Sequence, residues 1–199
     1  MSRSEEILDF WFGTDAEQPL KNSKLWWKKD PETDLQIKET FGHDLAAAAN
    51  GELEPWKLEP LGSLAFIILT DQFSRNIYRE TSTMYLYDEL ALVTCLTGQD
   101  EGFPSDLSLA QRWFYYMPMM HSESLIMQRR SVETYRRLAD ESTSAAPEVH
   151  KALENTYDFA RRHFEIVESF GRFPHRNSIL GRKITSAEEE FLAQPGSSF

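Results

Sequence analysis

The chain has 199 residues and a formal net charge of -11, so it lacks the surplus of lysine and arginine that nucleic-acid binding needs. Hydrophobic residues make up 41% of it and aromatic residues 13%, which excludes a disordered protein. The apolar runs are too short for a membrane span, the first residues do not resemble a signal peptide, and a single cysteine excludes an internal disulfide. We therefore expect a soluble, cytoplasmic protein with one domain over residues 1–193 and a loose tail at 194–199.

The first half of the chain carries helical signals and no hairpin signal for strands. A first helix is predicted to open at Ser4 and to end at Gly13, and a second occupies 31–51, with a proline in its first turn. Residues 60–73 are apolar on most sides and predict one nearly fully buried helix. The next helix is predicted over 81–98, capped by its threonine and ended by its glycine.

The second half of the chain continues the helical pattern. Helices are predicted over 105–117, ended by Pro118, and over 122–140. The clearest helix begins at Pro147, and a capping box at 185–188 starts a short final one. The apolar seam of the long helix consists of Leu153, Tyr157, Ala160, Phe164 and Val167. Short connections between such helices predict an all-α fold of antiparallel helical hairpins stacked as an array.

A basic segment stands out near the C-terminus of this acidic chain. Residues 112–183 hold twelve lysines and arginines against nine acids, and no acid lies between Glu168 and Glu188. Within "FGRFPHRNSILG", Gly171 ends the long helix and Pro174 stiffens the loop that follows. The donor side chains of this loop are Arg172, His175, Arg176 and Asn177. Such groups suit a phosphate or carboxylate, although arginines that cap helix carbonyls would have the same pattern.

A second polar cluster, "DQFSRNIYRE", follows the most apolar helix directly. Its site candidates are Asp71, Gln72, Arg75 and Asn76. Asp71, Arg75 and Arg79 repeat at intervals of four, which puts them on one face if the helix continues. The carboxylate could hold an arginine fork toward an anion, or it could form an internal pair that ties the helix end to the next loop.

A third cluster, "PMMHSESL", contains His121, Ser122 and Glu123. Ser122 suits an N-cap and Glu123 suits the positive end of the following helix, so both have a structural explanation. His121 precedes that helix after an apolar run, where a neutral imidazole is favoured, as a general base or as a structural residue. The His-x-Glu pairs at 121–123 and 163–165 lack the spacing of a metal motif. We expect no metal and no cofactor.

Four segments in this order, "ILDFWFG", "DQFSRNIYR", "MPMMHSES" and "GRFPHRNSILGR", resemble the bacterial family called domain of unknown function 924. The resemblance covers roughly residues 6–192 and implies a fold related to tetratricopeptide repeats, without catalytic roles. One departure is Ser74, where the family usually has proline. The positions that match the family's signature are Asp71, Gln72, Arg75, Asn76, His121, Ser122, Glu123, Arg172, His175, Arg176 and Asn177.

Three functions follow from these patterns. The three clusters could converge into an Arg/His/Asn pocket that binds a small anionic ligand, a phosphate or a carboxylate. The same pocket could belong to a hydrolase-like enzyme in which His121 or His175 is the acid/base, oriented by Asp71 or Glu123, beside charge-stabilising arginines. A peptide-binding adaptor would instead have a protein partner in an exposed groove. The tryptophans available to line that groove, which fit a core better, are Trp26, Trp27, Trp56 and Trp113.

Overall fold

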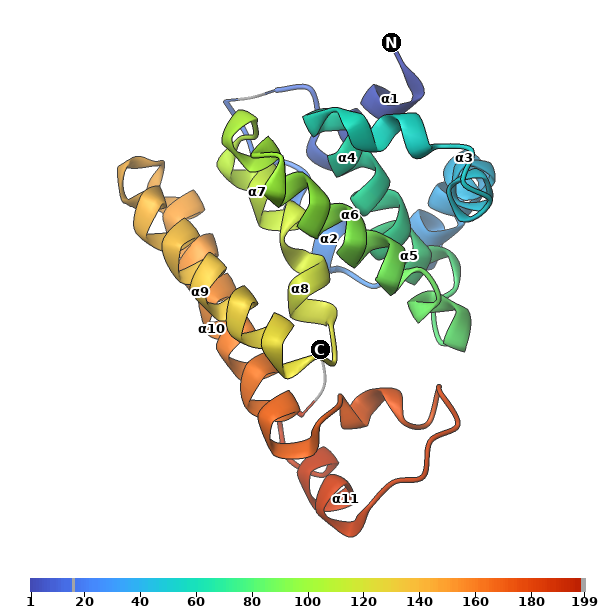
Figure 1. Cartoon of the computed structure of the whole chain (residues 1–199), viewed down its shortest axis with the longest axis vertical. Helices are drawn as coiled ribbons and strands as arrows, with labels where there is room; N and C mark the ends of the chain where they lie inside the picture. The colour runs from blue at the N-terminus through green and yellow to red at the C-terminus, as the bar shows by residue number, and fades with distance from the viewer. Residues whose placement is uncertain (16, 198–199) are drawn as a thin grey trace.

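The computed structural model describes residues 1–15 and 17–197, and within these residues the chain is helical and contains no strand (Figure 1). The predicted all-α class is therefore confirmed. The α-helices are α1 (Arg3–Phe12), α2 (Ser23–Trp27), α3 (Pro31–Ala49), α4 (Pro60–Ile67), α5 (Ser74–Ile77), α6 (Asp88–Asp100), α7 (Leu109–Tyr115), α8 (Met117–His121), α9 (Leu125–Glu141), α10 (Pro147–Phe170) and α11 (Ser186–Leu192).

The long helices α9 and α10 form an antiparallel hairpin that lies along one side of the group made by α1 to α8 (Figure 1). Pro147 opens α10, and Gly171 ends it with a left-handed φ of 68°, as its sequence predicts. The seam differs from the prediction, because Tyr157 and Phe164 are only partly buried. The residues that α10 buries are Val149, Leu153, Thr156, Ala160, His163, Ile166 and Val167.

The core surrounds α4, whose residues from Gly62 to Ile67 are all buried. An aromatic cluster closes the core near α1, where the Trp11 ring lies 5.5 Å from those of Phe73 and Phe114 in edge-on geometry. Trp26 and Trp113 are buried as expected for core residues, whereas Trp27 is 56% exposed. The single cysteine, Cys95, is also buried, and burial raises the pKa of its thiol to about 12, so it is unreactive.

The predicted helix over 60–73 is in fact three elements. After α4 the chain makes a π-helical turn over Ile68–Phe73 and then continues as α5. In this turn the Ser74 N–H bonds to the carbonyl of Leu69, five residues back. The hydroxyl of Ser74 donates to the carbonyl of Thr70 at 2.6 Å, so the widened turn is closed by its own side chain.

Other helix boundaries also differ from the prediction. α1 begins one residue earlier than Ser4, because the capping box is made by Ser2 and Glu5. α6 begins only at Asp88, after a 3-10 turn, and passes through Gly98. Gly98 is required for packing, since a Cβ there would lie 1.8 Å from the Tyr115 hydroxyl.

Near α8 the prediction places two boundaries differently from the structure. The helix predicted over 105–117 is shorter, because α7 covers Leu109–Tyr115. Pro118, which the sequence predicts to end it, instead lies in the first turn of α8, a helix that the sequence did not indicate. α9 begins at Leu125, so Ser122 is not the N-cap of this helix. The hydroxyl of Ser122 instead accepts the N–H of Ser124 at 3.2 Å.

The predicted capping box of Thr185 and Glu188 opens α11. Beyond α11, Ser197 is buried and donates its hydroxyl to the carbonyl of Leu192 at 3.1 Å. Residues 198–199 of the predicted tail lie outside the described residues. None of the described helices combines the length and the apolarity that crossing a membrane requires.

Candidate functional site

The π-helical turn carries Asp71, whose side chain is fully buried. An extra residue per turn rotates the residues that follow by about 100° relative to an uninterrupted α-helix. Such turns are rare, and they occur frequently at functional sites. The turn therefore marks this part of the core as the place to look for chemistry.

Asp71 is joined to His121, the last residue of α8. Asp71 Oδ1 lies 2.7 Å from His121 Nδ1, and the Gln72 amide donates to the other carboxylate oxygen. Burial alone would raise the pKa of Asp71, but the charge of Arg75 and the hydrogen bonds with His121 and Gln72 hold it well below the ordinary value. Asp71 is thus a buried carboxylate that stays ionised and fixes the orientation of the imidazole.

Arg75 links this pair to a second carboxylate. Its Nη1 lies 3.2 Å from Asp71 Oδ1, and its Nη2 lies 3.0 Å from Oδ1 of Asp88, the first residue of α6. Arg79 does not join them, because α5 ends at Ile77 and Arg79 turns to Asp34 at 2.6 Å. The intervals of four in the sequence therefore bring together only the first two members of that series.

Arg176 brings the C-terminal loop into the same network. Its Nη1 lies 3.4 Å from Asp88 Oδ2, and its Nη2 donates to the carbonyl of His121 at 3.0 Å. The guanidinium lies between two rings, 4.5 Å from the centre of Tyr85 and 4.6 Å from that of Phe173. All three polar clusters of the sequence thus contribute to one network, which consists of Asp71, Arg75, Asp88, His121 and Arg176.

The network holds two carboxylates and two arginines, so its formal charges balance, and their surroundings shift the pKa values of these groups. Burial raises the pKa of Asp88, to which nearby Asp71 adds, although Arg75 and Arg176 oppose the rise. Burial and the neighbouring Arg75 lower the pKa of Arg176. Two carboxyl groups whose pKa values move in opposite directions are typical of acid–base sites.

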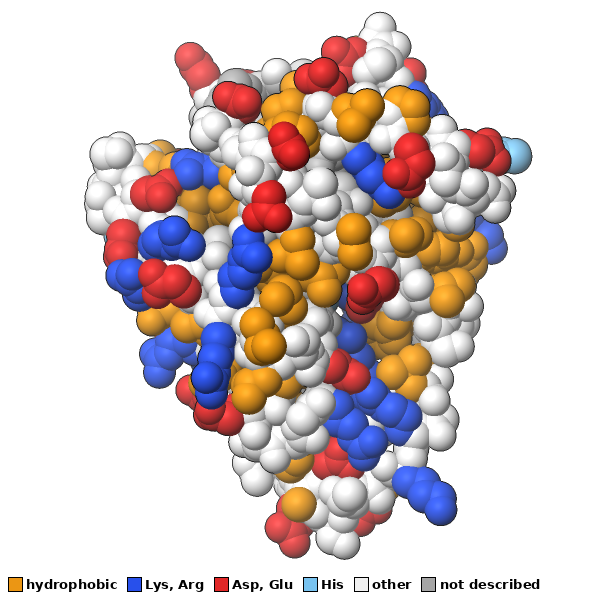
Figure 2. Space-filling view, in the orientation of Figure 1, with side chains coloured by type: hydrophobic (Ala, Val, Ile, Leu, Met, Phe, Trp, Pro, Cys, Tyr) orange, Lys and Arg blue, Asp and Glu red, His pale blue; other side chains and the backbone are white. Residues whose placement is uncertain are grey.

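Solvent reaches the network at three side chains. The exposed fractions are 18% for His121, 17% for Arg75 and 22% for Asp88. In Figure 2, blue basic side chains interleaved with red acidic ones lie over the lower part of the molecule, where the chain after α10 runs. The network is thus a core feature with a partly exposed edge.

Two further histidines surround His121. The ring of His163 in α10 is centred 6.4 Å from that of His121, and burial lowers the pKa of His163 to about 3. His175, in the C-terminal loop, packs 5.6 Å from the ring of Phe173, and burial with neighbouring Arg176 lowers its pKa to about 4. Both imidazoles are therefore neutral at physiological pH.

Several predicted site residues have partners outside the network. The Asn76 amide donates to Asp34 at 2.8 Å, and Arg172 pairs with Glu188 at 2.7 Å. Arg172 holds the pKa of Glu188 far below the ordinary value. Asn177 is buried, and neither polar atom of its side chain has a hydrogen-bond partner among the described residues. Asn76 and Arg172 therefore fasten loops to helices.

Glu123 fastens the C-terminal loop to the start of α9. It accepts the N–H of Phe173 at 2.8 Å and pairs with Arg182 at 2.7 Å, and Arg182 in turn donates to the Phe173 carbonyl at 3.0 Å. The structure therefore gives Glu123 a role in holding the loop, and the carboxylate that orients His121 is Asp71.

Sequence reasoning missed three residues around the site: Asp88, His163 and Tyr85. His163 had a detectable signal, because a buried seam at 149, 153, 156, 160 and 163 keeps the same 4-3 spacing as the predicted seam and shares residues 153 and 160 with it. Asp88 and Tyr85 carry no such signal, since their role depends on how α6 meets α5 and the loop. Across residues 1–15 and 17–197, no three histidine, cysteine or acidic side chains come together as a metal site.

These features define an all-helical protein with a buried network of two carboxylates, two arginines and a histidine. The family described as "Bacterial protein of unknown function (DUF924)" matches residues 7–196, and the chain belongs to it. The chain is similar to the protein of unknown function ATU0120 from Agrobacterium tumefaciens, with 32% identity, 96% of each chain covered and a TM-score of 0.76. No curated protein matches the chain.

Proposed function

We propose that this protein is an enzyme that hydrolyses a small anionic substrate, with His121 as general base and Asp71 as the carboxylate that orients it. The observation that carries the proposal is the 2.7 Å contact between Asp71 Oδ1 and His121 Nδ1. Because Asp71 stays ionised, it selects the tautomer that has its proton on Nδ1. The lone pair of Nε2 is then the basic site for a substrate proton.

In this mechanism a water molecule at His121 Nε2 gives up a proton as it attacks the substrate. The imidazolium that forms is stabilised by the Asp71 carboxylate, and it returns the proton to the leaving group. Positioned acid–base groups of this kind accelerate reactions by about 100- to 10,000-fold. His163 and His175, which stay neutral, add no competing positive charge beside the ring.

The anionic part of the substrate is assigned to Arg75 and Arg176. Both guanidinium groups converge on Asp88, and a phosphate or carboxylate can replace that carboxylate between them. Arg172 is paired with Glu188 and has no part in the exchange.

A protein that binds the anion without reacting would use the same two arginines, and it differs only in having no turnover.

The tetratricopeptide-like arrangement also remains a prediction. The α9–α10 hairpin is the kind of unit that such arrays stack. The ring of Trp27, although 56% exposed, packs on the core aromatic cluster, 5.6 Å from the ring of Trp113 and stacked 6.0 Å from that of Phe114, so it does not favour a peptide groove.

The test begins with a thermal-shift screen of phosphorylated and carboxylated metabolites. A ligand at a hundred times its Kd adds about 2.7 kcal/mol of stability, a rise of about 5 to 10 °C in the melting temperature of a chain of this size. Each compound that raises the melting temperature is then incubated with the protein, and hydrolysis is followed by proton NMR.

Three variants separate binding from reaction. His121→Gln should keep the thermal shift and lose at least about 100-fold of the hydrolysis rate. Arg176→Lys should reduce the shift itself, because the planar fork is lost. His43→Gln, at an exposed position of α3, is the matched control. Hydrolysis that persists in a folded His121→Gln protein would refute the mechanism, and a shift without hydrolysis would leave a binding protein.

A further inference from the structure

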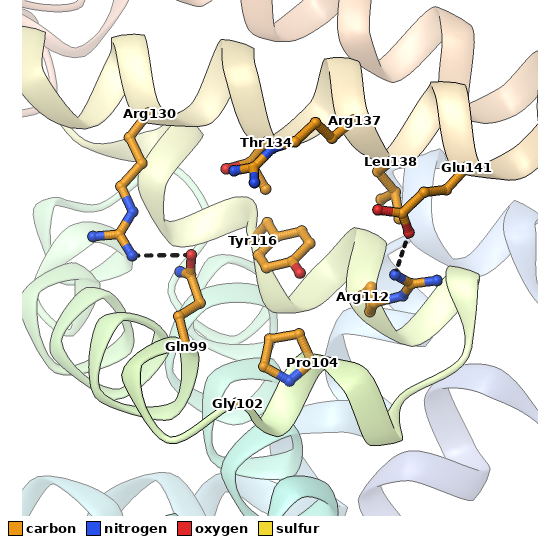
Figure 3. A pocket seen from close by; sticks show the side chains of 10 residues that line it. All are labelled: Gln99, Gly102, Pro104, Arg112, Tyr116, Arg130, Thr134, Arg137, Leu138 and Glu141. Atoms are coloured by element: carbon orange, nitrogen blue, oxygen red, sulfur yellow. Dashed lines mark hydrogen bonds and ion pairs between the residues drawn. The ribbon is translucent and has the colours of Figure 1, made fainter.

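A cavity of about 270 Å³ lies where the end of α6 and the following turn face α7 and α9 (Figure 3). None of its residues belongs to the Asp71–His121 network. The residues that line it are Gln99, Gly102, Pro104, Arg112, Tyr116, Arg130, Thr134, Arg137, Leu138 and Glu141. It is concave, small and lined mainly by polar side chains.

The cavity concentrates positive charge. Three arginines and one glutamate line it, a surplus of two positive charges in a chain whose formal net charge is -11. Arg112 alone pairs with that glutamate, Glu141, at 2.6 Å. Arg137 reaches only Glu133, outside the cavity, at 3.7 Å. The acid inside the cavity therefore does not neutralise it.

Arg130 is held in place by a neutral partner. Its Nη2 donates to Gln99 Oε1 at 3.2 Å, and the amide of Gln99 donates to the carbonyl of Cys95 at 3.2 Å. The second bond fixes which way the amide points, so the oxygen of Gln99 faces Arg130. Gln99 therefore orients the guanidinium of Arg130 but, being neutral, does not compensate its positive charge.

Two buried polar atoms at the cavity have no hydrogen-bond partner among the described residues. They are the Oγ1 of Thr134, a residue only 6% exposed, and the Nε of Arg112. Burying such groups without a partner costs about 1–3 kcal/mol each. Figure 3 shows the Tyr116 ring in the middle, with Arg130 and Gln99 on one side and Arg112 and Glu141 on the other.

We infer that this cavity is a second binding site, and that it takes a small dianion, a phosphate monoester or a short dicarboxylate. Two guanidinium groups on opposite sides of an aromatic ring, with the hydroxyl of Thr134 between the helices, match a ligand with two negative charges. The volume is near the lower end for small-molecule pockets and excludes a polymer. The inference does not depend on the reaction proposed for His121.

The experiment uses isothermal titration calorimetry of the full chain at low ionic strength, with inorganic phosphate and succinate as dianions and acetate as monoanion. Both dianions should bind at this cavity, and acetate should bind there at least about tenfold more weakly. Arg130→Gln should weaken dianion binding by about tenfold or more. Arg129→Gln removes the same charge from the adjacent, 67% exposed position and should leave the affinity unchanged.

Amide chemical shifts locate the bound ion even if a variant fails to fold. Titration of the wild-type protein with phosphate should move the signals of Tyr116 and Thr134 and leave that of Asp71 in place. Arg176→Lys, which should weaken anion binding at the network, should retain the dianion affinity here, and this separates the cavity from the site proposed above. Absence of heat with both dianions, equal losses in the two arginine variants, or shifts confined to Asp71 and His121 would overturn the inference.

Discussion

Asp71 and His121 are fifty positions apart in the sequence, yet Asp71 Oδ1 and His121 Nδ1 are 2.7 Å apart in the folded protein. The same carboxylate also pairs with Arg75. Asp71→Asn therefore leaves the largely buried guanidinium of Arg75 with Asp88 as its remaining carboxylate partner. Breaking a buried pair in this way costs about 3–5 kcal/mol of unfolding free energy. We expect a loss of that size for Asp71→Asn in urea unfolding.

Asp158→Asn is the control for this prediction. Asp158 is 62% exposed and lies 3.7 Å from its partner Arg161, a geometry that contributes little to stability. Its urea midpoint should match that of the wild-type protein. Equal midpoints for Asp71→Asn and Asp158→Asn would contradict the account of the network.

A second prediction concerns acid stability and His163. Burial lowers the pKa of His163 from 6.5 to about 3, so the folded protein leaves this ring neutral where the unfolded chain protonates it. Stability is therefore complete above about pH 6.5 and declines as the pH falls toward 3. Between about pH 7 and pH 5 the loss from this residue is about 2 kcal/mol.

The measurement is the unfolding free energy of wild type and His163→Gln at several pH values in that range. The difference between the two proteins should shrink as the pH falls, because only the wild type must release this proton on folding. His43→Gln, exposed on α3, should parallel the wild type. A constant difference for His163→Gln would show that His163 is not buried as a neutral ring.

A third prediction compares two helical glycines. A Cβ at Gly62 would lie 2.3 Å from the backbone oxygen of Trp56, whereas a Cβ at Gly42 meets nothing within 4 Å. Gly62→Ala should therefore cost about 1–3 kcal/mol through overpacking. Gly42→Ala should add about 0.5–1 kcal/mol, since alanine is the better helix former within α3.

Thermal unfolding of the two alanine variants tests this prediction directly. The melting temperature should fall for Gly62→Ala and rise for Gly42→Ala. Changes of the same sign in both variants would mean that the close approach of α4 to the Trp56 carbonyl is not maintained in solution.

A fourth prediction concerns the C-terminal loop. Glu123 accepts the Phe173 N–H and pairs with Arg182, so Glu123→Gln weakens the two charged contacts that hold this loop against α9. A charge-assisted hydrogen bond contributes about 1.5–3 kcal/mol, and losing it should speed exchange of the Phe173 amide by about 10- to 100-fold.

Hydrogen exchange measured by NMR gives both the signal and its control. The amide of Ala160, in the middle of α10, should exchange at the wild-type rate in Glu123→Gln. Unchanged exchange at Phe173 would show that the loop is held by its buried rings instead.

Local chemistry made much of this structure predictable. Pro147 and Gly171 bound the longest helix because their own backbone preferences act within a few residues, and the capping box at Thr185 works in the same way. The convergence of the three polar clusters was a hypothesis about distant segments, and Asp71, His121 and Arg176 do meet in one network.

The remaining features depend on tertiary contacts. The π-helical turn at Ile68–Phe73 interrupts an apolar stretch whose composition suits an α-helix equally well. Gly98 looks like a helix end, and only the position of Tyr115 shows that it is a packing residue inside α6. Arg172 and Arg176 are four residues apart in one loop, but Arg172 pairs with Glu188 and Arg176 pairs with Asp88.

The alternation of charge from Asp71 through Arg75 and Asp88 to Arg176 also constrains how these four positions vary among related sequences. Each member touches a neighbour of opposite sign, so a neutral replacement of any one of them leaves a largely buried charge without one of its partners and lowers the stability. A lineage could change the network only by replacing adjacent members together, which single-base mutations seldom achieve. These four codons should therefore be retained or lost as one unit among descendants of this protein.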